Sequence, residues 1–481
     1  MRLAFNKFIE RARDPYRLLE GEFERCDHLD NLLRPGRLIP YTAPTAITGG
    51  QTNLGALKRA AYDGNLYGLG TGSADAYATM HKVTSPTAST WTALANPAAS
   101  GSVQYPMLEE YHGALYFWPD TAGNIGKHDI ASPNASDMAS WQSVTLSPSI
   151  GPGHYFKSND VLNIAYGYKL GQLADTTFTP DKLVLNPEHR IASMAEWNDY
   201  ECIGCRTAND NTVVHFWDGV QNAPLFSREI PGEYLLALRN VGGELVAVTA
   251  PAASSILRQR ISFYVLRGSE FQRVRQHVSF EGAASSASVI LPERTARVKD
   301  NQLYFCAGLQ TGAATTEYGI YRFGLNEGRY AFNRARFATS GNTETFAADI
   351  GALEWFGDYP FAVHTSHGTI TKAGGSGNPS CTYRIGQLDF GKKAQKKKAV
   401  EVSVSTAPLP AGESVTVKYA VDGGSLTTLF THSGTGKVST VKRSVKAIPN
   451  FSLISIQAEP TVRAEITEVA IDAIPVANKY G

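Results

Sequence analysis

The sequence predicts an all-β protein whose largest part is a β-propeller of about seven blades. Three observations lead to this prediction. A polar or glycine-containing turn followed by a short apolar strand recurs roughly every 40–60 residues. A second segment follows each copy, and most of these segments alternate polar and apolar residues, as half-buried strands do. The i, i+3, i+4 apolar periodicity expected of helical repeats is not found.

Seven copies of the turn-and-strand motif are recognisable. One small antiparallel sheet cannot bury both of its faces, whereas blades packed in a circle cover the faces of their neighbours. The copies are YDGNLYGLG (62–70), YHGALYFWP (111–119), SNDVLNIAYG (158–167), WNDYECIGC (197–205), VGGELVAVT (241–249), KDNQLYFCAG (299–308) and FGDYPFAVH (356–364). The segments that follow them are YATMHKV, GNIGKHDI, GYKLGQL, TVVHFWDG, ISFYVLRG, YGIYRFG and GTITKAG.

The first two copies agree beyond the motif itself. Gly64 and Gly113 are 49 positions apart, and Trp91 and Trp141 are 50 positions apart. Two separate anchors with nearly the same period indicate a duplication of one blade. By the same count, the stretch 299–308 is expected to be the second strand of the sixth blade.

The remaining regions do not follow the repeat, and they define the predicted domain boundaries. We expect an N-terminal arm at 1–50, a propeller at 51–391, a lysine-rich linker at 392–398 and a β-sandwich at 399–481. The arm has two interpretations: a lead-in that closes the propeller ring, or an extension that grips a neighbouring subunit. The last region alternates strictly and contains turn residues near Pro408–Gly412 and at Asp422, which is typical of a small sandwich.

Composition excludes several functional classes. Lys plus Arg is 45 and Asp plus Glu is 44, so the net charge of +1 creates no overall attraction to nucleic acid or membranes. Five lysines between Lys392 and Lys398 favour a solvated linker over a nucleic-acid patch. The charged N-terminal segment does not resemble a signal peptide. No apolar run of about 18 residues occurs, so no membrane span is expected.

The chemistry-bearing residues predict no active site. Asp120, Asp129, Asp199 and Asp218 are the carboxylates that a glycosidase could use, but each is expected in a turn, where Asp is common. We therefore predict no enzyme activity and no catalytic, cofactor-binding or metal-binding residues.

Possible metal ligands and sugar-stacking aromatics also receive structural interpretations. Cys202 and Cys205 form a single CxxC without a second ligand pair nearby, which favours two small strand residues over a zinc site. His364 and His367 have a spacing that places two strand residues on opposite faces. Three tryptophans in or after strands are expected to pack between blades, although a lectin function stays open: Trp118, Trp217 and Trp355.

Two segments at the ends of the chain resemble virion proteins of tailed bacteriophages. DPYRLLEGEFERCDHLDNLLRPGRLIPY (14–41) is similar to an arm that leads through an Arg-Pro-Gly segment into a propeller. TYRIGQLDFGKKAQKKKAVEVSVSTAPLPAGESVTVKYAVDGGSLTTL (382–429) is similar to the junction between such a propeller and a sandwich, with its LPAG turn and Asp-Gly-Gly hairpin. These motifs are structural and carry over no catalytic residues.

The resemblance implies a structural component of the neck or tail, of the ring, nozzle or hub type. The implied partners are other copies of the chain in a ring, portal or adaptor proteins, tail proteins, and packaged DNA that passes without sequence recognition. The implied location is the virion, after synthesis in the host cytoplasm. The alternative is a carbohydrate- or receptor-binding propeller, or a glycan-active enzyme, at the tail tip. Clustered exposed aromatics and paired carboxylates on one face would favour this alternative.

Overall fold

The computed structural model consists of β-strands and one short 3-10 helix among the residues that it describes, which confirms the predicted all-β class. These residues fall into two compact units. The blade unit is Pro44–Tyr318 with Ala338–Gly374, and the terminal unit is Met1–Ala43, Gly319–Phe337 and Gly375–Gly481. The described residues are 2–5, 9–10, 22–23, 25–27, 29–30, 37–40, 44–47, 54–70, 80–88, 90–94, 107–118, 124–132, 138–144, 154–158, 160–251, 260–277, 288–291, 293–311, 314–326, 329–336, 350–357, 359–364, 369–373, 381–390, 395–434, 439–445, 447–461 and 463–476.

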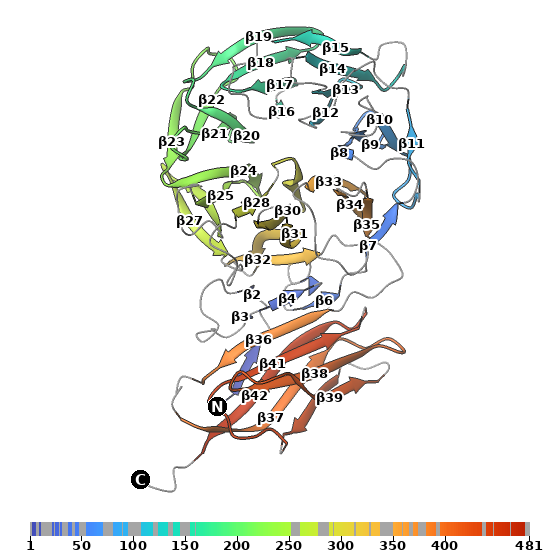
Figure 1. Ribbon diagram of the computed structural model, residues 1–481, viewed down its shortest axis with the longest axis vertical. Helices are drawn as coiled ribbons and strands as arrows, with labels where there is room; N and C mark the ends of the chain where they lie inside the picture. Colours follow the sequence, from blue (N-terminus) through green and yellow to red (C-terminus); the bar gives the residue numbers. More distant parts are fainter. Residues whose placement is uncertain are drawn as a thin grey trace. The chain divides into compact units, whose positions relative to one another are not determined.

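The blade unit is a succession of four-stranded antiparallel sheets, each built from strands that are consecutive in the chain. Figure 1 shows these sheets following one another around a centre, which is the arrangement of a β-propeller. The first three sheets are β8 (Leu54–Arg59), β9 (Leu66–Gly70), β10 (Met80–Val83) and β11 (Thr92–Ala93); β12 (Leu108–Tyr111), β13 (Ala114–Phe117), β14 (Asn124–Asp129) and β15 (Met138–Ser143); and β16 (His154–Ser158), β17 (Val161–Tyr166), β18 (Lys169–Ala174) and β19 (Thr177–Val184).

The next two sheets repeat this order with longer strands. They are β20 (Arg190–Trp197), β21 (Tyr200–Arg206), β22 (Thr212–Trp217) and β23 (Phe226–Ile230); and β24 (Glu233–Val241), β25 (Glu244–Pro251), β26 (Ile261–Arg267) and β27 (Glu270–His277). In each of these sheets, the first strand starts the meander and the fourth strand ends it. The segments that the sequence marked as following each motif copy include β10, β14, β18, β22 and β26, the third strands of these sheets.

The last sheet of the blade unit contains three strands from the C-terminal end of this unit and one strand from its N-terminal end. It consists of β33 (Ile350–Phe356), β34 (Tyr359–His364), β35 (Thr369–Ala373) and β7 (Pro44–Ile47). β7 pairs antiparallel with β35, from Ile370↔Ile47 to Ala373↔Pro44. Four elements follow the fifth sheet in the chain: β28 (Ser288–Ile290), the 3-10 helix η1 (Glu293–Thr295), β29 (Arg297–Lys299) and β30 (Gln302–Thr311). Both β28 and β29 pair with β30.

The seven motif copies form seven hairpins among the described residues, each with a residue of positive φ in its turn. Between β20 and β21 these are Asn198 (φ 46°) and Asp199 (φ 65°), and between β24 and β25 they are Gly242 (φ 61°) and Gly243 (φ 90°). Two successive positive φ angles match the right-handed twist of the strands that they join. The other five turns contain Gly64, Gly113, Asp160, Asn301 and Gly357.

The apolar cores of the blade unit lie between neighbouring sheets. Leu69 of the first sheet and Phe117 of the second share one buried cluster, and similar clusters join the second to the third, the third to the fourth and the fourth to the fifth sheet. A further cluster contains Leu57 and Trp91 of the first sheet with Phe361 of the last. Each of the first four sheets therefore shares a buried cluster with a neighbour on both sides, as the sequence predicts for blades.

The terminal unit contains two larger groups of paired strands. One has the order β1-β42-β37-β40, and the other contains β32-β4-β36-β41-β38-β39, with β31 beside β32. Their bounds are β1 (Arg2–Phe5), β4 (Arg25–Asp27), β31 (Ala314–Asn326), β32 (Arg329–Arg336), β36 (Thr382–Leu388), β37 (Lys397–Thr406), β38 (Ser414–Val421), β39 (Thr427–Ser433), β40 (Ser439–Ser444), β41 (Ile454–Pro460) and β42 (Ile466–Pro475). Two short pairs are β2 (Ile9–Glu10) with β3 (Glu22–Phe23) and β5 (Leu29–Asp30) with β6 (Ile39–Pro40).

One buried cluster joins the two groups of strands. It contains Val404 of β37 and Ile471 of β42 from one group, and Ile456 of β41 and Val417 of β38 from the other. The N-terminal segment contributes Leu29 to this cluster. β1 also pairs with β42 along its whole length, and β4 pairs with β36, so the described parts of the segment 1–43 are strands within their own chain.

The unit boundaries differ from the predicted ones in four places. Residues 319–337, predicted as propeller, belong to the terminal unit. In the other three places, strand pairing crosses the predicted boundary. β7 pairs with β35, so residues 44–47 belong to the blades instead of the predicted arm. β36 pairs with β41, so residues 382–388 belong to the terminal unit. Lys397 and Lys398, predicted as linker, begin β37 and pair with β42. Among the described residues, no helix has the length and apolar character needed to cross a membrane.

Candidate functional site

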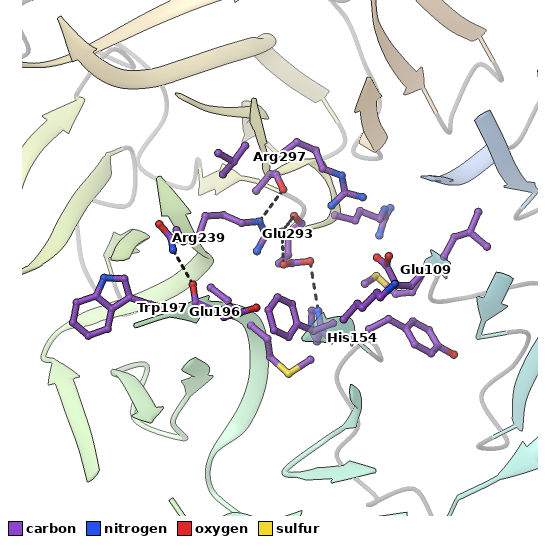
Figure 2. Close-up of a pocket in the computed structure, with 18 of the residues that line it drawn as sticks. Glu109, His154, Glu196, Trp197, Arg239, Glu293 and Arg297 are labelled. Atoms are coloured by element: carbon purple, nitrogen blue, oxygen red, sulfur yellow. Dashed lines mark hydrogen bonds and ion pairs between the residues drawn. The ribbon is translucent and has the colours of Figure 1, made fainter. Parts of the chain in front are cut away.

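The blade unit contains a pocket of about 640 Å³, called here the axial pocket (Figure 2). Its walls come from the first strands of successive sheets, β8, β12, β16, β20 and β24, and from the segment η1–β29. Residues that are far apart in the sequence meet here because the meander places the first strand of every blade next to the centre. This size is typical of small-molecule sites.

A carboxylate at the floor of the pocket connects three different sheets. Glu293 of η1 forms an ion pair with Arg239 Nη2 of β24 at 2.6 Å. Ser193 Oγ of β20 donates a hydrogen bond of 2.9 Å to Glu293 Oε1. His154 Nδ1 of β16 lies 3.6 Å from Glu293 Oε2, which is an ion-pair distance longer than a good hydrogen bond. We call Glu293, Arg239, Ser193 and His154 the axial network.

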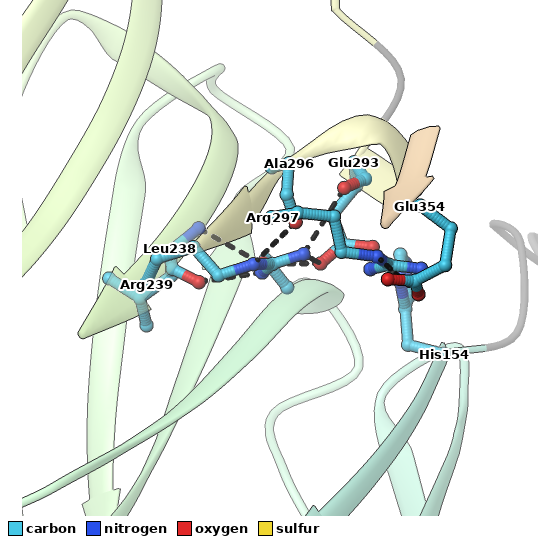
Figure 3. A network of polar contacts seen from close by, with 8 residues as sticks. His154, Leu238, Arg239, Glu293, Ala296, Arg297 and Glu354 are labelled. Atoms are coloured by element: carbon cyan, nitrogen blue, oxygen red, sulfur yellow. Dashed lines mark hydrogen bonds and ion pairs between the residues drawn. The ribbon is translucent and has the colours of Figure 1, made fainter. Parts of the chain in front are cut away.

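The guanidinium of Arg239 is held by backbone oxygens as well as by Glu293 (Figure 3). Its Nε donates to the carbonyl of Ala296 at 2.9 Å, and its Nη1 donates to the carbonyl of Leu238 at 2.7 Å. Nη1 also donates to Ser193 Oγ at 2.8 Å. Arginine provides several donors in one rigid plane, so a single side chain can fix several partners.

The charges of the axial network stabilise each other. Burial alone would raise the pKa of Glu293, but the neighbouring Arg239 and His154 outweigh this and hold the pKa well below its ordinary value. The carboxylate is therefore ionised throughout the physiological range. Its side chain is 14% exposed and that of Arg239 is 15% exposed, so water screens this pair weakly. Breaking one partner of such a pair leaves an uncompensated charge in the interior.

Other charged groups around the pocket are partly used by the fold. Glu109 forms an ion pair with Lys58, and Arg297 Nε lies 3.2 Å from Glu354 Oε2 of β33. Glu196 accepts a hydrogen bond of 3.2 Å from the Ser158 hydroxyl. Three exposed charged residues at the pocket form no ion pair with the described residues: Lys157, Glu196 and Asp199.

A second buried carboxylate is Glu201 of β21, which is paired with Glu196 of β20. It is 3% exposed, and its Oε2 accepts a hydrogen bond of 2.8 Å from Asn163 Nδ2 of β17. Burial raises the pKa of Glu201 to about 7; the Asn163 hydrogen bond lowers it, and the charges of Glu196 and Asp218 raise it further. Glu201 is not among the residues that line the axial pocket.

Three of the four carboxylates considered in the sequence lie in described segments, one at the end of β14, one in the β20–β21 turn and one after β22. Asp199 lines the axial pocket from the turn before β21. Asp218 accepts hydrogen bonds from the backbone N–H groups of Val220 and Gln221, each at 2.9 Å, and so caps a turn as expected. Asp129 accepts a hydrogen bond from the backbone of Ala131 in the same way. Asp120 lies outside the described residues.

The two cysteines considered as metal ligands lie on opposite faces of their strand. Cys202 and Cys205 are both in β21, but one packs between the fourth and fifth sheets and the other between the third and fourth. Burial raises the pKa of the Cys202 thiol to about 12, so it is not a thiolate at neutral pH. His364 ends β34, and His367 lies outside the described residues.

The three tryptophans occupy packing positions. Trp118 and Trp217 are fully buried, Trp118 between the second and third sheets and Trp217 between the third and fourth. Trp355 of β33 packs edge-on against Tyr304 of β30, with ring centroids 4.9 Å apart. This confirms the prediction that these residues pack between sheets.

The sequence did not reveal any member of the axial network: Glu293, Arg239, Ser193 or His154. η1 lies outside the turn-and-strand motif, and Arg239 stands in β24 as an ordinary charged residue of a strand. Their pairing depends on the order of the sheets around the centre. The only available signal was the segment LPERTAR (291–297), which places three charged residues in a short stretch before a strand.

No protein-family model matches this chain, and no curated protein matches its sequence. Solved structures with a similar fold include the β-propeller domain of Myceliophteria thermophila Cps50 (Swd1), with 10% identity and a TM-score of 0.45 over 69% of this chain and 99% of that one. Chaetomium thermophilum Raptor has 12% identity and a TM-score of 0.45 over 70% and 29% of the two chains. An exo-beta-1,3-galactanase from Phanerochaete chrysosporium has 12% identity and a TM-score of 0.31 over 88% and 100%. Such distant likenesses carry no information on function.

Proposed function

We propose that this chain is a structural, non-catalytic component of a tailed-phage virion. It forms part of a neck or tail ring around the DNA exit channel and docks neighbouring tail proteins. The observation that carries the non-catalytic part is the axial network: the central carboxylate of the pocket forms an ion pair with Arg239, accepts a hydrogen bond from Ser193 and lies at ion-pair distance from His154. The phage assignment is carried by the resemblance of residues 14–41 and 382–429.

The distribution of carboxylate chemistry supports this interpretation over a glycosidase. A glycosidase needs one carboxyl group with a raised pKa and a second, ionised one, both at the substrate. Here the carboxyl group with the raised pKa, Glu201, is buried away from the pocket lining. Within the pocket, Glu293 is held ionised by an arginine and Glu109 is paired with Lys58. Of the other two carboxylates that line it, Glu196 accepts a hydrogen bond from Ser158 and Asp199 is exposed to solvent.

We also propose the finer architecture that such a role requires, beginning with seven blades. Six complete sheets and the β29–β30 hairpin, which stands sixth in chain order, match the seven motif copies. β30 side chains meet the sheets on both sides, since Phe305 approaches Phe263 at 6.0 Å and Tyr304 approaches Trp355 at 4.9 Å.

The terminal unit is proposed to be a β-sandwich. Its two groups of strands share one apolar core, as two packed sheets do. Several copies in a ring would then be held by many weak contacts that add by avidity.

Immunoelectron microscopy of particles from the source tests the proposal. Antibody raised against the purified chain is expected to label a closed ring at the neck or tail. Serum absorbed with the same purified chain is the control and should give no label. Labelling confined to fibre tips, or no labelling of any particle, would overturn the proposed role.

A further inference from the structure

The axial pocket has a rim that the axial network does not use. Its exposed side chains include Lys157, Glu196, Asn198, Asp199 and Asn240. Lys157 Nζ lies 5.7 Å from the centroid of the Tyr111 ring and forms no ion pair with the described residues. Asp199 is exposed and receives no hydrogen bond from them. Lys157 and Asp199 therefore have hydrogen-bonding groups that the described residues leave available to a ligand in the pocket.

The turn that holds Asp199 gives it a fixed position. The loop between β20 and β21 has only two residues, both with positive φ, and Trp197 before it donates Nε1–H to the carbonyl of Gly243 at 2.9 Å. Asn240 Nδ2 donates to the carbonyl of Glu196 at 3.1 Å, and Asn240 Oδ1 accepts from the N–H of Gly243. Neighbouring hairpins thus hold this side of the rim in place, which lowers the entropy lost on binding.

The charged side chains that line the pocket balance in sign: four are acidic (Glu109, Glu196, Asp199 and Glu293) and four are basic (Lys157, Arg239, Arg294 and Arg297). An anion would meet the carboxylates of Glu196 and Asp199, and a cation would meet Lys157 and Arg294. The opposite charges on the floor already neutralise each other, because Glu293 is paired with Arg239. A neutral ligand rich in hydroxyl groups can donate to the carboxylates and accept from lysine and asparagine without any uncompensated charge.

Apolar side chains complete the lining. Met107 and Phe156 are half-buried, and Val298 is 38% exposed. They offer contact for the C–H groups of a sugar ring beside the polar rim. A cavity of about 640 Å³ has room for a small ligand of this kind.

We propose that the axial pocket binds a neutral mono- or disaccharide. Asp199 and Glu196 accept hydrogen bonds from its hydroxyl groups, Lys157 donates to its oxygens, and Phe156 contacts an apolar face of the ring. This goes beyond the structural role proposed above and is independent of it, since binding is measured on the purified chain.

Saturation-transfer difference NMR on the full chain tests this proposal. The probes are glucose, galactose, mannose, maltose and lactose, with glucuronate and glucosamine as charged comparators. At least one neutral sugar is expected to receive saturation and to compete with another neutral sugar. Absence of transfer to all five neutral probes, or preference for a charged comparator, would overturn the proposal.

The variant Asp199→Asn assigns the binding to the axial pocket. Asn tolerates positive φ, so the turn is kept while the charged acceptor is lost. We expect affinity for the bound sugar to fall about tenfold, as for loss of a charge-assisted hydrogen bond. The matched control is Asp300→Asn, which makes the same change at an exposed turn residue (φ 52°) outside the pocket lining.

A second variant, Lys157→Gln, probes the other side of the rim and is also expected to weaken binding. Circular dichroism confirms that each variant is folded before titration. Equal affinities for the wild type, Asp199→Asn and Lys157→Gln would place the sugar elsewhere and contradict the inference. An equal loss in Asp300→Asn and Asp199→Asn would do the same.

Discussion

The two units of this chain are held together by different interactions. The blade unit has many small apolar clusters, each shared by two sheets, and a polar network in which three sheets meet one carboxylate. The terminal unit has one continuous apolar core and joins its distant segments by backbone pairing, as between β1 and β42. Removal of a single charged side chain should therefore strongly lower the stability of the blade unit, and removal of a single apolar side chain should do the same in the terminal unit.

The largest effect is expected from breaking the axial network. Glu293→Ala leaves Arg239 without its counter-charge in a site of low exposure, and we expect the free energy of unfolding to fall by about 3–5 kcal/mol. Urea unfolding followed by circular dichroism measures this. Lys418→Ala is the control in the terminal unit, because it removes a more exposed pair (Lys418–Glu459, 2.7 Å) and should cost less than about 1 kcal/mol. Equal losses would show that burial of the pair is unimportant.

The terminal unit should respond most to its apolar core. Ile456→Ala removes a fully buried side chain of β41, and the cavity is expected to lower the free energy of unfolding by about 3 kcal/mol. Val400→Ala truncates a residue of β37 that is 45% exposed and should change it by less than about 0.5 kcal/mol. A small effect of Ile456→Ala would mean that the shared core does not hold this unit together.

The buried carboxylate Glu201 should make the blade unit sensitive to pH. Its pKa is raised from 4.5 to about 7, so between these values the folded state binds more protons than the unfolded state. The contribution of this group to the free energy of unfolding is therefore full below about pH 4.5, and it falls by about 3 kcal/mol as the pH rises to about 7.

Glu201→Gln mimics the protonated acid and removes this fall. The variant should match the wild type near pH 5 and exceed its stability near pH 8, as measured by urea unfolding at both values. Because Glu293 has a lowered pKa and loses stability only under more acidic conditions, the two carboxylates are separable by pH. A wild type and variant with the same pH dependence would contradict the role of Glu201.

The smallest effect is expected in the hairpin turns. Gly243 has φ +90°, and a Cβ atom at this position would meet open space, so Gly243→Ala adds backbone strain without a clash and should cost about 1 kcal/mol. Gly434→Ala adds the same methyl group in open space at a residue without positive φ, and it should be neutral or slightly stabilising. Thermal unfolding of both variants measures the difference. Equal shifts of the unfolding temperature in both variants would mean that the positive φ of Gly243 does not contribute to stability.

The blades were largely predictable because their signals are local. All seven turn-and-strand copies form hairpins, and Gly64 and Gly113 occupy equivalent turns with φ of 74° and 75°. The 50-residue spacing of Trp91 and Trp141 was weaker evidence for a repeated blade. Trp91 packs against the last sheet, whereas Trp141 packs toward the third, so the two residues share a spacing but face different neighbours.

The remaining features depend on contacts between distant segments. No local pattern shows that Arg2–Phe5 will pair with a strand near residue 470, or that residues 44–47 will complete the last sheet. The axial network is of the same kind, because Glu293, Arg239 and His154 meet only after several sheets are in place. Asp199 was considered from the sequence as one of four turn aspartates, and it is the fold that places it at the pocket.

Hydrogen exchange measured by mass spectrometry on the wild type and Glu293→Gln tests most directly whether the central carboxylate is structural. If it ties the sheets together, amides of β16, β20, β24 and β29 will exchange faster in the variant, while those of β37 and β42 will not change. Unchanged exchange throughout the blade unit, with lost sugar binding as the only consequence, would contradict this account and assign Glu293 to ligand recognition instead.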